Sequence, residues 1–161
     1  MQNSEQNYLV ILKESLDKKI RLLEDILEQN KLQENILHEP EIDFDRFNDT
    51  VDVKEKCIKE LEVLDRGFQT IYDRVKEALN EDKEAYRQDI KELQEKIKTI
   101  TEKSMDIQSG EARNKEAFQK SITESRKNIR SVKTANKVAS NYYQSMNKLN
   151  VVDSQFLDTK K

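Results

Sequence analysis

The chain has 161 residues, of which 38% are charged and 35% hydrophobic, with two glycines, one proline and no tryptophan. This length is enough for one domain, and the composition is typical of long helices and coiled coils rather than of a globule with a thick core. The net charge of −3 singles out no class of partner, and the one cysteine, Cys57, excludes an intramolecular disulfide and a cysteine-based zinc site.

Two stretches of helical periodicity open the chain. Apolar residues recur in steps of three and four from Tyr8 to Leu37, which predicts an amphipathic helix. Pro40 ends it, because the residue before a proline is pushed out of helical geometry. Asp43 or Asp45 can cap a second helix, whose apolar pattern runs to Leu79. A short connection between helices of like length predicts an antiparallel hairpin.

The next break signal is Asn80 to Asp82, where we expect a turn. From Asp82 to Ala139 a single glycine, Gly110, and no proline interrupt the sequence. The pattern therefore predicts a third helix of about 58 residues, which would be roughly 87 Å long. Its apolar face fades after Ile107, where residues in step with that face become polar.

The helices of the hairpin hold about 35 residues each and would span roughly 52 Å, so the third helix exceeds them by about 23 residues. Length and periodicity both place the end of the bundle near residue 117. We expect an all-α, coiled-coil-like antiparallel bundle of three long helices in residues 1–117, with the third helix extending beyond the hairpin. Residues 118–161 would form a helical extension and a tail.

This C-terminal segment differs in charge from the rest of the chain. Residues 119–161 carry nine Lys or Arg and three Asp or Glu, a net charge of +6, which leaves −9 for residues 1–118. Such an arm suggests an interaction segment. The candidate protein-binding residues are apolar or aromatic and recur near helical spacing: Phe118, Ile122, Ile129, Val132, Tyr142, Tyr143, Met146, Leu149 and Phe156. They either contact a partner or fold back against the hairpin.

No catalytic constellation occurs in the sequence. There is one histidine, His38, one cysteine and no glycine-rich phosphate loop, so we expect neither an enzyme nor a cofactor or metal site. The sequence also has no apolar run near 18 residues, and its first residues, Met1 to Asn7, are polar, so we expect no signal peptide. We therefore expect a cytoplasmic protein with no stable membrane insertion.

Several stretches of the chain match a known family pattern. They are Tyr8 to Leu12 with Leu22-Leu23-Glu24; Lys54-Glu55-Lys56 leading to Leu61 to Arg66; Ile107-Gln108 with Glu111 to Asn114; and Ala139 to Tyr143. On these residues the chain resembles the FlgN-type flagellar export chaperones. The resemblance implies a cytoplasmic protein of type III secretion that holds hook–filament junction proteins unpolymerised before export. It also implies that Tyr142 and Tyr143 dock on the export gate.

Two other functions are compatible with the sequence. The extended part of the third helix could pair with its own copy, giving a structural coiled-coil homo-oligomer. The basic residues between Lys120 and Lys137 could bind nucleic acid or an anionic membrane, although serine and asparagine dilute their charge. We favour the chaperone, with flagellar hook-associated clients, no nucleic acid, and a monomeric or weakly homo-oligomeric state.

Overall fold

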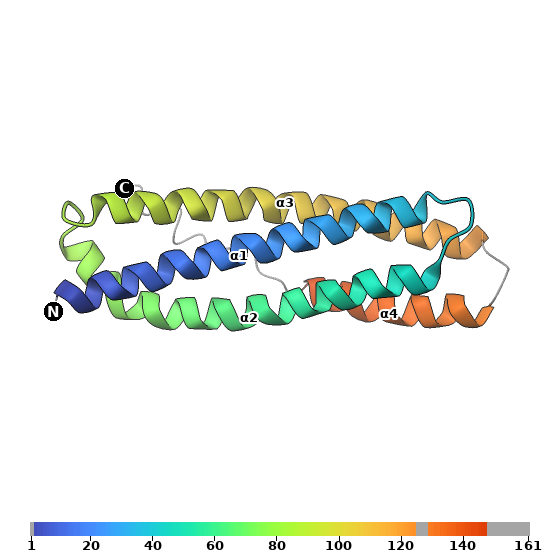
Figure 1. Cartoon of the computed structure of the whole chain (residues 1–161), viewed down its shortest axis with the longest axis horizontal. Helices are drawn as coiled ribbons and strands as arrows, with labels where there is room; N and C mark the ends of the chain where they lie inside the picture. The colour runs from blue at the N-terminus through green and yellow to red at the C-terminus, as the bar shows by residue number, and fades with distance from the viewer. Residues whose placement is uncertain (1, 125–128, 148–161) are drawn as a thin grey trace.

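The computed structural model describes residues 2–124 and 129–147, and within these residues it is all-helical with no strand. Helix α1 spans Gln2–Leu37, α2 Phe44–Glu81, α3 Arg87–Glu124 and α4 Ile129–Asn147. The helices alternate in direction and form an elongated bundle (Figure 1). The expected all-α helical bundle is confirmed.

The hairpin of α1 and α2 forms as the sequence predicts. The connection carries Pro40, and Asp43 caps α2 by accepting hydrogen bonds from the backbone N–H groups of Asp45 and Arg46, at 3.1 and 3.2 Å. These bonds satisfy donors that the first turn of a helix otherwise leaves unpaired. The second predicted turn is also present, because α2 ends at Glu81 and α3 begins at Arg87.

Helix α1 packs against both α2 and α3, so it is the central helix of the first three (Figure 1). Leucine and isoleucine side chains fill the interior, and each fully buried one contributes about 1.5–3 kcal/mol relative to an exposed position. Buried residues of this core include Leu9, Leu12, Leu23, Ile26, Phe47, Leu61, Val75, Leu93, Ile97, Ile100 and Ile107.

The predicted length of the third helix is wrong. Helix α3 ends at Glu124 rather than near Ala139, and it has 38 residues, as many as α2. The following helix, α4, packs on α2. The physical reason is that an extension without neighbours would be marginal in water, whereas α4 buries an apolar stripe of its own by lying against the hairpin.

The expected end of the bundle at residue 117 coincides with no break in the described structure. Helix α3 runs through this position, and Phe118 is buried with its ring stacked on that of Phe47, 4.6 Å between centroids. The division of roles between residues 1–117 and 118–161 stays a prediction. None of the described helices is long and apolar enough to cross a membrane.

Candidate functional site

Helix α4 presents a narrow buried face to the bundle. Ala135, Ala139 and Tyr142 are buried, while Val132 and Tyr143 are partly buried and pack against the core. The spacing of four and then three residues puts the first three side chains on one side of the helix. The two alanines add little apolar area, so most of the buried surface of this stripe comes from Tyr142.

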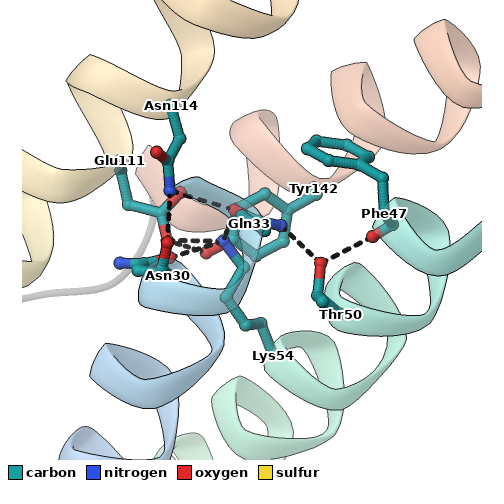
Figure 2. A network of polar contacts seen from close by, with 8 residues as sticks. All are labelled: Asn30, Gln33, Phe47, Thr50, Lys54, Glu111, Asn114 and Tyr142. Atoms are coloured by element: carbon teal, nitrogen blue, oxygen red, sulfur yellow. Dashed lines mark hydrogen bonds and ion pairs between the residues drawn. The ribbon is translucent and has the colours of Figure 1, made fainter. Parts of the chain in front are cut away.

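Next to Tyr142 the four helices share a buried polar cluster of seven residues: Asn30, Gln33, Thr50, Lys54, Glu111, Asn114 and Tyr142 (Figure 2). Its centre is Lys54 of α2, which is 0% exposed. The Nζ of Lys54 donates to Oδ1 of Asn30, Oε1 of Gln33 and Oε1 of Glu111, each at 2.8 Å. All three donors of the ammonium group are thus used.

Glu111 of α3 joins this ammonium group to α4. Its Oε1 atom forms the ion pair with Lys54 and also accepts a hydrogen bond from the hydroxyl of Tyr142 (Figure 2). The Nζ of Lys54 lies 4.1 Å from the centroid of the Tyr142 ring, within the range of a cation–π contact. One tyrosine therefore contacts both members of a buried ion pair.

Amide side chains fix the remaining geometry. Nδ2 of Asn114 donates to the backbone carbonyl of Asn30 at 2.9 Å, which ties α3 to α1. Nε2 of Gln33 donates to Oγ1 of Thr50 at 2.8 Å, and this hydroxyl donates to the carbonyl of Phe47 at 2.6 Å. These bonds fix Asn30 and Gln33, whose side-chain oxygens accept hydrogen bonds from Lys54.

Burial changes the protonation chemistry of the cluster. Desolvation lowers the pKa of Lys54 to about 8, while the neighbouring Glu111 acts in the opposite direction. Desolvation, reinforced by the charge of Glu111, raises the pKa of Tyr142 far above its usual range. The pKa of Tyr143 is raised for the same two reasons. Both tyrosines therefore resist ionisation even at pH values where an ordinary tyrosine loses its proton.

Some buried polar atoms of the cluster and of α4 lack a hydrogen-bond partner among the described residues. They are Oε2 of Glu111, Nδ2 of Asn30 and the hydroxyl of Tyr143. An unsatisfied buried polar atom costs about 1–3 kcal/mol. Only the hydroxyl of Tyr143 belongs to α4, so most of this cost arises inside the first three helices.

The structure places the predicted site residues in three different surroundings. Phe118 and Tyr142 are buried, and Ile122, Val132 and Tyr143 are partly buried. Nζ of Lys115 lies 5.5 Å from the Tyr143 ring centroid, so α3 also contacts α4. The other predicted residues have side chains that lie outside the described part of the chain: Ile129, Met146, Leu149 and Phe156. The role of all nine predicted residues in protein binding stays a prediction.

Sequence reasoning did not identify Lys54, Glu111, Gln33 or Thr50 as a cluster. A signal was present in the spacing, because Lys54 follows Val51 by three residues in the apolar pattern of α2, and Glu111 and Asn114 fall in step with the apolar face of α3. Charged and amide residues at positions that continue an apolar pattern indicate a polar layer inside the bundle. They do not indicate that this face of the helix has become exposed.

The described residues hold no group of three His, Cys, Asp or Glu side chains that could bind a metal ion. The fold and the cluster define an α-helical bundle protein whose last described helix packs on α2 through Ala135, Ala139 and Tyr142. The model of the FlgN protein family matches residues 9–150, which is most of the chain and includes all of α2, α3 and α4. The chain therefore belongs to the FlgN family of flagellar export chaperones, a chaperone family rather than an enzyme family. No curated protein and no solved structure matches it.

Proposed function

We propose that this protein binds flagellar hook-associated proteins in the cytoplasm, holds them unpolymerised and delivers them to the export gate. The observation that carries the proposal is the family match over residues 9–150, which includes the amphipathic helix α4. A chaperone for clients that assemble through helices needs an apolar helical surface to offer them.

The structure adds a physical reason for assigning client contact to α4 and its surroundings. Helix α4 has 19 residues, about half the length of the others, and packs mainly on α2. Its outer face carries polar and basic residues such as Lys133, Asn136 and Lys137. A helix with a narrow buried face and imperfectly satisfied polar neighbours separates from a bundle at lower cost than a central helix does.

The argument for a structural homo-oligomer has lost its main support. It relied on an extended half of the third helix that would pair with its own copy, whereas α3 ends at Glu124 and the next helix lies on α2. Light scattering of the purified chain without client checks this directly, and we expect no stable dimer.

The proposal is tested with the hook-associated proteins of the source organism. Each is mixed with the chain, and complex formation is followed by size-exclusion chromatography with light scattering, while client polymerisation is followed by sedimentation. We expect a soluble complex with at least one of them and a loss of its polymerisation. If every client polymerises equally fast with the chain and with an equal mass of serum albumin, the proposed function is wrong.

A further inference from the structure

We propose that two copies of the chain associate weakly through the outer face of the α1–α2 hairpin, antiparallel and related by a two-fold axis. This face has a groove, which we call the hairpin groove. Its lining includes the apolar residues Leu22, Val63 and Leu64 together with charged residues of both helices. Every described residue that lines it belongs to α1 or α2, so the groove lies apart from the polar cluster and from α4.

The charged residues of α1 differ in their pairing according to the side of the helix on which they lie. Toward α3, Lys13 forms an ion pair with Asp89 at 2.6 Å. Toward the hairpin groove, Lys18 and Asp25 are exposed, and neither forms an ion pair with any other described residue. This side of α1 therefore keeps charges of both signs available for a partner.

The groove side of α1 has a pattern that is complementary to its own reverse. Ile11, Lys18, Asp25 and Leu32 follow one another at intervals of seven residues, or about 10.5 Å along the helix. In an antiparallel pair of these helices, Ile11 faces Leu32 of the other copy and Lys18 faces Asp25 of the other copy. Each contact occurs twice, because the axis is two-fold. A second copy thus supplies a complementary side chain at all four positions.

Exposed apolar side chains occur where the two copies would touch. Ile11 and Leu32 are 43% and 40% exposed, and Val63 of α2 is 61% exposed. Leu22 lies next to the midpoint of the pattern on α1, and Val63 lines the groove beside it, so both would lie near the two-fold axis. Association removes part of this apolar surface from water, which favours the pair.

The extent of the surface makes this association weak. Stable specific interfaces bury about 1,200–2,000 Å², whereas the apolar residues here are few and separated by charges. Each solvent-exposed ion pair adds little affinity. We expect a dissociation constant of about 0.1–1 mM, so the chain remains a monomer at the micromolar concentrations of ordinary light scattering.

The test measures the dissociation constant of the full chain by sedimentation equilibrium at concentrations that span this range. Lys18→Glu or Asp25→Lys alone places like charges opposite each other and should weaken the pair about tenfold. The double variant exchanges the two signs and should restore the affinity to within about twofold of the wild type. The matched control is Lys31→Glu, which makes the same charge change at an exposed position of α1 outside the groove.

A mixture of the two single variants gives a sharper result. Opposite charges then face each other at both positions, so the mixture should associate more tightly than either variant alone. An effect of net charge alone would place the affinity of the mixture between those of the two variants, because it depends on the product of their charges.

A paramagnetic label reports the direction of the two helices. The label is attached to Glu14→Cys in a chain that also carries Cys57→Ser, and this chain is mixed with isotopically labelled wild type. The antiparallel pair predicts broadening of wild-type amide signals around Leu32, and broadening around Ile11 instead would contradict the arrangement.

The proposal is overturned if the chain stays monomeric throughout the range, if the double variant fails to restore affinity, or if the mixture associates no more tightly than its components. An equal effect of Lys31→Glu and Lys18→Glu also overturns it. Lys18 and Asp25 are exposed, so circular dichroism should show unchanged helix content in all variants. The chaperone proposal does not depend on the outcome, because it assigns no client contact to the hairpin groove.

Discussion

The sharpest energetic prediction concerns Lys54. The variant Lys54→Met keeps an unbranched apolar side chain of similar length but removes the ammonium group and its three hydrogen bonds to Asn30, Gln33 and Glu111. The carboxylate of Glu111, 6% exposed, would remain buried without its counter-ion. Removing one partner of a buried ion pair costs about 3–5 kcal/mol, so we expect a loss of that size in the free energy of unfolding.

The same reasoning predicts the result of removing the whole pair. A chain with Lys54→Met, Glu111→Leu and Tyr142→Phe no longer holds a buried charge at this position, and it keeps the ring that packs on α2. Replacing a buried ion pair by apolar residues is often neutral or stabilising. This triple variant should therefore recover part of the stability that Lys54→Met loses, because the buried oxygens of Asn30 and Gln33 still lack the ammonium donor.

Urea denaturation at neutral pH, followed by far-ultraviolet circular dichroism, measures these free energies. The matched control is Lys19→Met, because Lys19 forms an ion pair with Asp65 at 2.7 Å whose acidic side chain is 42% exposed. Water can solvate that carboxylate after the substitution, so the control should cost about 1 kcal/mol or less. Equal costs for Lys54→Met and Lys19→Met would refute the description of the cluster as a desolvated pair.

Further predictions concern the core and the titration of the cluster. In urea denaturation, Leu61→Ala should lower the free energy of unfolding by about 2–5 kcal/mol and Phe118→Ala by about 3–5 kcal/mol, because both side chains are buried. A negligible loss for Phe118→Ala would instead favour a surface role for that ring. The pKa of Lys54 is about 8 in the folded chain and 10.5 in the unfolded chain, so between pH 8 and 10.5 the unfolded chain binds more protons. The free energy of unfolding should therefore rise with pH in this range. Denaturation at several pH values should show that this rise is larger for the wild type than for Lys54→Met. The absorbance of tyrosinate that develops up to about pH 11 should be the same in Tyr142→Phe and in the wild type, since Tyr142 stays protonated in the folded chain. A smaller absorbance in the variant would mean that the hydroxyl of Tyr142 is accessible.

Much of the fold could be predicted from periodicity. The apolar patterns before Leu37 and from Phe44 to Leu79 depend on local spacing, and the turn at Pro40 has a steric cause, so these elements agree with the structure. The length of the third helix could not be predicted in this way. Its reversal into α4 involves no proline or glycine, and it is favoured by burial against α2, which is a tertiary effect that no local pattern contains.

The polar cluster could be predicted only in part. Asn30 was recognisable as a polar residue within an apolar pattern, a position that often sets the register of packed helices. The partners of such a residue come from other helices, and Lys54 and Glu111 are 57 positions apart in the chain. Their pairing depends on how the helices align, so spacing within one helix indicates burial of each residue but not which residues meet.

The order of the helices along the chain has a consequence for how the molecule forms. Helix α1 contacts both α2 and α3, so these three can assemble as one cooperative unit, whereas α4 packs mainly on α2 and is synthesised after the others. The amides of α4 should exchange with deuterium as a separate group, at a lower opening free energy than those of α1. Every newly synthesised molecule would then pass through a stage in which α2 is already folded and its edge is still uncovered.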